Sequence, residues 1–185
     1  MFKINQVYHF DCIKFMKKIS DGCISMILTD TPFEMEDGSD QASYNHNEDD
    51  YYSWIKKLFF ECKRILKYGG SFFLECSIPR LATISNILNE YFEFVERWPD
   101  DRSNVFHCIK FPNLKNKDHP YQTTQIRLLK DAIQKYTNEG DLIFDPFMGT
   151  GTTALMAKAM KRNYLGCEVN KKYVEKARNK LAKLR

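Results

Sequence analysis

The chain has 185 residues and a formal net charge of +4, and 43% of its residues are hydrophobic. This length and composition are typical of one globular domain with a single core, and they exclude disordered and fibrous proteins. The opening segment, MFKINQVYHF, has no signal-peptide pattern, and the chain has no run of about 18 apolar residues, so we expect a cytoplasmic protein without a membrane span.

The charged residues are unevenly distributed. Between Asp30 and Asp50 there are acids but no lysine or arginine, whereas residues 157–185 are rich in both and contain only two acids, Glu168 and Glu175. A solvated helix face explains such a basic tail more often than a polyanion site does, so the tail alone does not indicate nucleic-acid binding.

The cysteines and histidines do not suggest a metal site. The cysteines stand singly, at Cys12, Cys23, Cys62, Cys76, Cys108 and Cys167. None belongs to a CxxC pair or to a zinc spacing, so we expect free thiols and no metal. His9, His46 and His107 also lack metal-ligand spacing and are interpreted as core or surface residues.

Strand and helix patterns alternate along the chain. In chain order we expect a strand at 6–11, a helix at 12–20, a strand at 23–30, a helix at 51–70, a strand at 71–77, a helix that becomes a strand over 84–98, a strand at 104–111, a helix at 123–140, a strand at 141–145, a helix at 152–161, a strand at 163–168 and a helix at 170–185. Gly69 and Gly70 predict a helix stop. The last part of 84–98 and the strand at 104–111 are expected to form an antiparallel edge hairpin. The fold class is therefore α/β, with a single domain and a mostly parallel twisted sheet covered by helices on both faces.

A glycine-rich turn lies between the strand at 141–145 and the helix that follows it. In DLIFDPFMGTGTTA, Gly149, Gly151 and Ala154 form a G-x-G-x-x-A arrangement, which in this context is typical of a nucleotide-cofactor turn. Glycines let the backbone approach a ligand closely, and Glu168, at the end of the next strand, can accept two ribose hydroxyls. A tight turn that binds nothing is the alternative interpretation.

The position of this turn distinguishes between cofactors. In a dinucleotide-binding domain the glycine fingerprint usually opens the sheet, whereas here only a helix, a strand and a helix follow Gly151. The motif order is therefore circularly permuted. We expect the strand that leads to Asp11 to lie beside the strand ending at Glu168. We expect Asp30 to lie beside the strand at 141–145, at the carboxyl edge of the sheet and facing the reactive end of the cofactor.

Five segments resemble, in the family's order, the S-adenosylmethionine-dependent DNA amino-methyltransferases of the β arrangement. FDPFMGTGTT is similar to the methionine-binding loop, LGCEVNKKYVEKA to the ribose-binding strand and helix, and HPYQTTQIRLL to the segment that closes over the methionine end. HFDC resembles Gly-Asp-Cys, whose acid meets the adenine amino group. LTDTPF stands where the family has Asp-Pro-Pro-Tyr. The resemblance covers nearly the whole chain and implies a Rossmann-like methyltransferase fold with S-adenosylmethionine as cofactor.

The resemblance also implies which residues form the site. The cofactor-binding residues would be Asp11, Asp30, His119, Gln122, Asp145, Pro146, Phe147, Gly149, Gly151, Thr152, Glu168 and Val169. The catalytic residues would be Asp30, Thr31, Pro32 and Phe33. A ring amino group is a poor nucleophile because its lone pair is delocalised. The Asp30 carboxylate and the Thr31 carbonyl, each accepting one N–H, favour a tetrahedral nitrogen. Pro32 stiffens the turn, and Phe33 offers a ring on which a flipped-out base can stack. A strand-ending turn with a core phenylalanine is the alternative.

In the family, Asp at the position of Asp30 goes with adenine N6 and Ser with cytosine N4, so we predict a site-specific DNA adenine-N6 methyltransferase. The alternatives are a cytosine-N4 enzyme, a weak or inactive DNA-binding relative acting as a subunit or regulator, and a nicotinamide-dependent oxidoreductase. Thr31 replaces the family's first proline, Phe33 replaces its tyrosine, and Thr123 and Thr124 stand where Lys-Pro is frequent. The Thr31 carbonyl and the Phe33 ring are still present, so the departures leave the weak or inactive relative as an alternative to the active enzyme.

The family places target recognition between its two halves. Here these halves would be a catalytic half at 1–90 and a cofactor half at 119–185, with a short hairpin at 91–118 between them. The residues there that suit contacts with DNA are Arg97, Trp98, Arg102, Lys110 and Lys115, with Lys117 as a further phosphate contact. A plain surface hairpin is the alternative. The expected partners are DNA, a second copy in a homodimer, and a restriction-system protein.

Overall fold

The computed structural model describes residues 2–30, 48–75, 81–94, 105–109 and 129–184. The elements in these ranges are β1 (Gln6–His9), α1 (Cys12–Met16), β2 (Ile24–Asp30), α2 (Glu48–Ile65), β3 (Leu66–Glu75), α3 (Leu81–Leu88), β4 (Glu93–Phe94), β5 (Val105–Ile109), β6 (Leu142–Asp145), α5 (Thr152–Ala159), β7 (Asn163–Glu168) and α6 (Lys171–Lys183). A further helix covers residues 129–136. Strands and helices therefore alternate as the sequence predicts.

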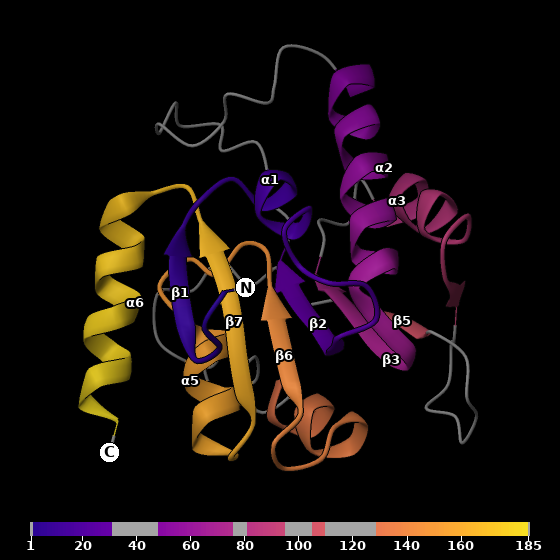
Figure 1. Ribbon diagram of the computed structural model, residues 1–185. Coiled ribbons are helices and arrows are strands. Elements are labelled where there is room, and N and C mark those ends of the chain that lie inside the picture. Colours follow the sequence, from indigo (N-terminus) through magenta and orange to yellow (C-terminus); the bar gives the residue numbers. More distant parts are fainter. Residues whose placement is uncertain (1, 31–47, 76–80, 95–104, 110–128, 185) are drawn as a thin grey trace, which may run out of the picture.

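The described strands form one sheet in the order β1-β7-β6-β2-β3-β5-β4, and all of their pairings are parallel. β1 lies beside β7, with His9 opposite Glu168. β2 lies beside β6, with Ile27 opposite Phe144. Figure 1 shows these strands next to one another although they come from opposite ends of the chain. Both neighbour relations predicted from the permuted motif order are confirmed.

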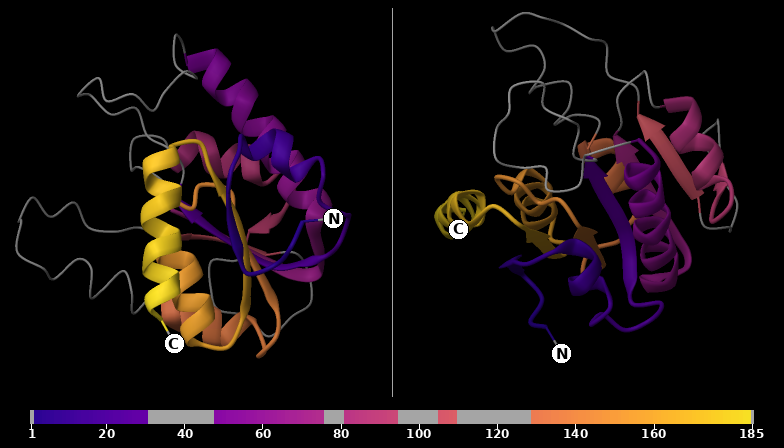
Figure 2. Two further views of the ribbon diagram at one scale, coloured as in Figure 1. Left: turned by 60° about the vertical axis from the view of Figure 1, so that its left-hand side comes forward. Right: turned by 90° about the horizontal axis from the view of Figure 1, so that it is seen from above.

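Two apolar cores cover the two faces of the sheet, because successive side chains of a strand point to opposite faces. On one face Ile27 and Phe144 belong to the core formed with α1, α2 and α3. On the other face Met26 and Ile143 pack with α5, α6 and the helix at 129–136. Viewed from above in Figure 2, α2 and α3 lie on one side and α5 and α6 on the other. The predicted α/β class with helices on both faces is confirmed.

The edge of the sheet differs from the prediction. β4 and β5 pair in parallel, with Glu93 opposite Val105 and Phe94 opposite Phe106, so the expected antiparallel hairpin is wrong. A hairpin is normally closed by about two to five residues, whereas a parallel pair needs a connection that crosses back to the same end of the sheet. Residues 95–104 separate β4 from β5, which is more than a hairpin loop usually has.

The junction between α2 and β3 also differs from the prediction. The helix ends at Ile65, and β3 begins at the next residue, so the two glycines do not stop the helix. The register between β2 and β3 jumps from Ile24 opposite Leu66 to Met26 opposite Ser71. Gly69, with φ at 71°, lies within this irregularity. Gly69 suits an irregularity in a strand for the same reason that a glycine suits a helix end, because it adopts a positive φ without steric cost.

Candidate functional site

Four neighbouring strands each end in or just before an acid at one edge of the sheet. Since β1, β7, β6 and β2 are adjacent and parallel, their carboxyl ends share this edge, at the upper end of the sheet in Figure 1. Asp145, Glu168 and Asp30 are the last residues of their strands, and Asp11 follows β1 closely. From β6 the chain continues to β7 on one side, and from β2 to β3 on the other. Open α/β sheets bind their ligands at such a switch point, outside the carboxyl ends of the strands.

The loop between β6 and α5 has the backbone of a ligand-binding turn. Gly149 and Gly151 have φ values of 51° and 89°, which L side chains rarely adopt. A Cβ at Gly151 would lie 2.8 Å from the Cβ of Ala177, so the absence of a side chain here lets α5 begin against α6. A Cβ at Gly149 would meet one described atom within 4 Å, the carbonyl oxygen of Phe147 at 3.9 Å. The described residues therefore leave space for a ligand beside Gly149.

Glu168 holds this loop from the end of β7. Its Oε2 accepts a hydrogen bond from the Gly149 amide at 3.0 Å, and its Oε1 accepts one from the Asn170 amide at 2.8 Å. A carboxylate has about four lone-pair sites, so acceptor capacity for ligand hydroxyls is left after these two bonds. The side chain is 9% exposed, which limits its movement. The glutamate therefore fixes the glycine loop and also suits a ribose.

Asp145 connects the same loop to β2. Its Oδ1 accepts hydrogen bonds from the Thr29 hydroxyl at 2.7 Å and from the Phe147 amide at 2.9 Å. Burial raises the pKa of Asp145 to about 6, while hydrogen bonds, first from Thr153 and then from Thr29, oppose the rise. Thr29 directly precedes Asp30, so this contact joins the end of the predicted catalytic strand to the predicted cofactor loop.

Asp11 and Asp30 lie on either side of these residues in the strand order. The Asp11 carboxylate caps α1 by accepting a hydrogen bond from the Lys14 amide at 2.9 Å. Next to it, the Phe10 amide donates to the Glu168 carbonyl at 3.1 Å, which keeps Asp11 close to the end of β7. Asp30 is exposed at the end of β2, a position from which a carboxylate can reach a substrate.

Two residues at this edge were missed by the sequence analysis. The sequence identifies Thr29 only as a strand residue, and its place directly before Asp30 is the one feature that points to a role in the site. Trp54 of α2 was read as part of a helical apolar pattern, but its ring centroid lies 5.8 Å from that of Phe147 in the cofactor loop. Neither contact is visible in a single sequence, because each joins segments that are far apart in the chain.

Many of the predicted site residues meet at this edge. The described ones are Asp11, Asp30, Asp145, Pro146, Phe147, Gly149, Gly151, Thr152, Glu168 and Val169. The predicted residues that lie outside the described part of the chain are Thr31, Pro32, Phe33, Arg97, Trp98, Arg102, Lys110, Lys115, His119 and Gln122. Their roles stay predictions.

The described residues contain no group of three or more His, Cys, Asp or Glu side chains that could hold a metal ion. Within the same ranges, no helix is long and apolar enough to cross a membrane. Cys12, Cys23, Cys62 and Cys167 are free thiols.

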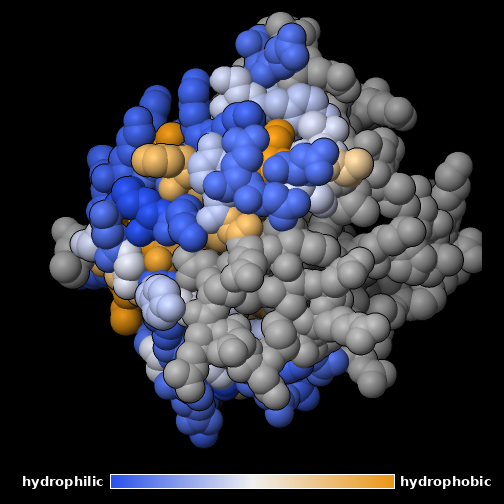
Figure 3. Space-filling view, turned by 90° about the vertical axis from the view of Figure 1, so that its right-hand side faces the viewer, coloured by the Kyte–Doolittle hydropathy of each residue, from blue (hydrophilic) through white to orange (hydrophobic). Residues whose placement is uncertain are grey.

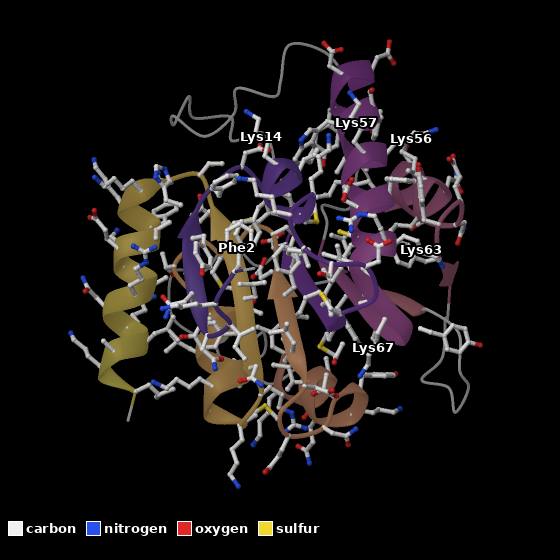
Figure 4. The ribbon with its side chains drawn as sticks, viewed as in Figure 1. Phe2, Lys14, Lys56, Lys57, Lys63 and Lys67 are labelled. Carbon is white, nitrogen blue, oxygen red and sulfur yellow. The ribbon has the colours of Figure 1, made fainter. Side chains whose placement is uncertain are left out.

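A lysine-rich face of α2 lies apart from the cofactor loop. Figure 4 shows Lys56, Lys57 and Lys63 along this helix. Lys56 forms an ion pair with Glu90 at 3.3 Å, and Lys63 lies 5.5 Å from the centre of the Phe92 ring. In Figure 3 this side of the molecule mixes hydrophilic and hydrophobic residues. The contacts of Lys56 and Lys63 within the chain are typical of a solvated helix face.

The fold and the site together define a Rossmann-like α/β protein with a glycine-rich strand-to-helix turn and an acid at the switch point. The chain belongs to the DNA methylase family of N6 and N4 methyltransferases, whose model matches residues 24–98 and 95–179. The resemblance to the S-adenosylmethionine-dependent DNA amino-methyltransferases is therefore confirmed at the level of the family.

Several curated proteins are similar to the chain. It is 25% identical to type II methyltransferase M.BamHI of Bacillus amyloliquefaciens, over 96% of this chain and 57% of that protein. It is 24% identical to type II methyltransferase M.HpaI of Haemophilus parainfluenzae, over 92% and 72%. It is 22% identical to the DNA adenine methyltransferase YhdJ of Escherichia coli K12, over 91% and 80%. The chain thus spans little more than half of M.BamHI and larger shares of the other two.

Solved structures show the same fold. The DNA modification methylase TTHA0409 of Thermus thermophilus, in complex with S-adenosyl-L-methionine, superimposes with a TM-score of 0.68 at 15% identity, over 96% of this chain and 93% of that one. The cytosine-N4-specific PvuII DNA methyltransferase superimposes with a TM-score of 0.64 at 16% identity, over 96% and 90%. The predicted methyltransferase fold is therefore confirmed.

Replacing Gly151 by alanine should destabilise the protein more than replacing Gly140. Both glycines have a positive φ, but a Cβ at Gly140 meets nothing described within 4 Å, whereas one at Gly151 meets Ala177. We expect a loss in the free energy of unfolding of about 1 kcal/mol for Gly140→Ala and about 3 kcal/mol for Gly151→Ala. Urea denaturation of both variants measures the difference. Equal losses would show that the packing against α6 is unimportant.

Asp145 should make stability depend on pH. Its pKa rises from 3.8 to about 6 on folding, so the folded protein binds more protons than the unfolded chain in this window, and stability falls as pH rises through it. Asp145→Asn removes the titration. Between pH 4.5 and 7.5 we expect the wild type to lose about 2 kcal/mol of unfolding free energy relative to the variant. Urea denaturation across this range tests it, and a constant difference would contradict it.

Proposed function

We propose that the chain transfers a methyl group from S-adenosylmethionine to the N6 amino group of an adenine in DNA. One observation carries this proposal: the parallel pairing of β2 with β6 puts Asp30 and the glycine loop at the same edge of the sheet. A catalytic carboxylate and a cofactor loop must be neighbours for a direct transfer between two bound substrates. The chain's membership of the DNA methylase family is consistent with this chemistry.

The described residues fit S-adenosylmethionine. Glu168 has acceptor capacity for the ribose hydroxyls. The described residues leave space beside Gly149, where a bound cofactor could lie against the backbone of the loop. Asp11, which follows β1 beside the end of β7, would accept a hydrogen bond from the amino group of the cofactor's adenine. When bound, this cofactor supplies a methyl group on a positively charged sulfur, and the electron pair of the broken C–S bond returns to that sulfur.

The chain's own residues would prepare the acceptor nitrogen. The Asp30 carboxylate accepts one N–H of the target amine, which favours a localised lone pair on nitrogen and stabilises the positive charge that develops there. The Thr31 carbonyl accepts the second N–H, and Phe33 stacks on the flipped base. As the N–C bond forms, the nitrogen loses one proton, which Asp30 can accept and pass to solvent. The proposed site therefore combines the Asp30 carboxylate, the Thr31 carbonyl, the Phe33 ring and the cofactor loop.

Adenine is favoured over cytosine as the substrate. Asp at the first position of the catalytic motif goes with adenine in the family, and the similar YhdJ is a DNA adenine methyltransferase. Cytosine N4 is the second candidate, because the fold also resembles a cytosine-N4-specific enzyme and both reactions use an exocyclic amine. A nicotinamide-dependent oxidoreductase receives no support from the family. Target recognition by residues 91–118, a homodimer and a restriction-system partner rest on the family resemblance alone. The weak or inactive relative rests on the departures from the family pattern at Thr31, Phe33, Thr123 and Thr124.

A methylation assay identifies the methylated nucleoside and tests the role of Asp30. With labelled cofactor and unmodified DNA, the wild type should produce N6-methyladenine. Asp30→Asn should lower turnover at least about 100-fold, because a neutral amide cannot stabilise the positive charge that develops on the target nitrogen. The affinity for the cofactor should stay within about threefold of the wild type. Asp131→Asn, at an exposed aspartate on another helix, is the matched control and should remain active.

Three results would contradict parts of the proposal. N4-methylcytosine as the only product would make cytosine the substrate. A fully active Asp30→Asn variant would remove Asp30 from the mechanism. DNA binding without methylation by the wild type would support the inactive alternative.

Glu168→Gln should weaken cofactor binding. An amide has one acceptor oxygen, so it cannot satisfy both the Gly149 and Asn170 amides as the carboxylate does. We expect the dissociation constant for S-adenosylmethionine to rise about 10- to 100-fold, measured by calorimetry. Glu175→Gln, at an exposed glutamate on α6, is the control and should bind normally. Unchanged affinity for Glu168→Gln would exclude Glu168 from the cofactor site.

A further inference from the structure

β2 and β6 separate before they reach the carboxyl edge. Their pairing comprises Met26 with Ile143 and Ile27 with Phe144. By contrast, β2 stays paired with β3 as far as Asp30, and β6 stays paired with β7 as far as Asp145. The backbone pairing therefore leaves the two strand ends apart at the switch point, where the proposed cofactor and base must meet.

Two side-chain hydrogen bonds join these strands beyond the backbone pairing. At the carboxyl edge the Thr29 hydroxyl donates to Asp145 Oδ1 at 2.7 Å. At the opposite edge the Ser25 hydroxyl donates to Asp141 Oδ1 at 2.8 Å. The two bonds have the same donor and acceptor chemistry, and both connect β2 to the β6 segment. They differ in their distance from the cofactor loop and in their surroundings, since Asp141 Oδ1 also pairs with Lys67 at 3.2 Å and the Ser25 bond is only partly buried. Ser25 therefore serves as the comparison for a bond between the same strands away from the loop.

The environment of the Thr29 bond is dry and tightly connected. Thr29 is 6% exposed and Asp145 is 4% exposed, so water cannot easily replace the bond if it is lost. The same oxygen of Asp145 accepts a hydrogen bond from the Phe147 amide in the cofactor loop. On the other side, Thr29 is covalently joined to Asp30. A single carboxylate oxygen thus connects the proposed catalytic residue to the proposed cofactor site through one hydroxyl.

We infer that Thr29 is a positioning residue for methyl transfer, holding the end of β2, and with it Asp30, against the cofactor loop through Asp145. This inference rests on the proposed function. Small displacements between a catalytic group and the reacting atoms lower turnover strongly even when binding is preserved. A residue that served stability alone would affect folding without this preference for turnover. The Ser25 bond provides that comparison, because it joins the same strands away from the site.

The experiment compares three single variants with the wild type. Thr29→Val keeps the size and branching of the side chain and removes the hydroxyl. Thr29→Ser keeps the hydroxyl, and Ser25→Ala removes the matched bond. Each variant is first melted to establish that it is folded, and then its kcat with DNA and its dissociation constant for S-adenosylmethionine are measured.

Turnover should separate the two positions. We expect Thr29→Val to lower kcat about 30-fold, Thr29→Ser to stay within about threefold of the wild type, and Ser25→Ala to stay within about twofold. Thr29→Val should also raise the dissociation constant for the cofactor about threefold, because Asp145 and the Phe147 amide lose one anchor, whereas Ser25→Ala should not. The loss in kcat should therefore exceed the loss in affinity.

The results that overturn the inference differ from those that overturn the proposed function. Equal kcat for Thr29→Val and the wild type, or equal losses for Thr29→Val and Ser25→Ala, would show that Thr29 does not position the site. The absence of methyl transfer by the wild type would defeat the proposed function instead. In that case the titration with S-adenosylmethionine still tests whether Thr29 supports the cofactor loop through Asp145. Equal cofactor affinities for Thr29→Val and Ser25→Ala would refute that link.

Discussion

The parallel contact between β2 and β6 is the constraint on which the rest of the molecule depends. It joins the first part of the chain to the last and creates the switch point of the sheet. Because parallel strands end at the same edge, this one pairing determines which acids and which loop come together. The helices on both faces then follow from the need to cover a sheet that is apolar on both sides. The candidate site is thus a result of topology before it is a result of individual side chains.

The order of the strands could be predicted from the sequence because few arrangements satisfy the rules for parallel α/β folds. A glycine turn placed late in the chain leaves too few elements after it to complete a sheet, so earlier strands must lie beside it. Asp145, Glu168 and the loop glycines were recognised for the same reason, since each stands at a strand end or in a strand-to-helix turn. Residues whose role depends on standing at a strand end can therefore be recognised from the amino-acid sequence.

Other features could not be predicted because different structures share the same local pattern. Gly69 and Gly70 suit a helix end or a bulge, and only the register with β2 distinguishes the two. The sequences of β4 and β5 carry no signal of strand direction, so their parallel pairing is known only from the structure. Thr29 has an ordinary reason to occur in a strand, since β-branched residues favour strands. Its contact with Asp145 depends on two segments meeting in space.

The close approach of Gly151 to Ala177 has a consequence for α6. The gap between the turn and that helix has no room even for a methyl group, so residue 177 limits the shape of the cofactor loop as directly as the glycine does. The small side chain of Ala177 and the missing side chain of Gly151 together allow this close approach. Helix α6, far along the chain from Asp30, therefore helps to fix the position of the glycine loop between β6 and α5.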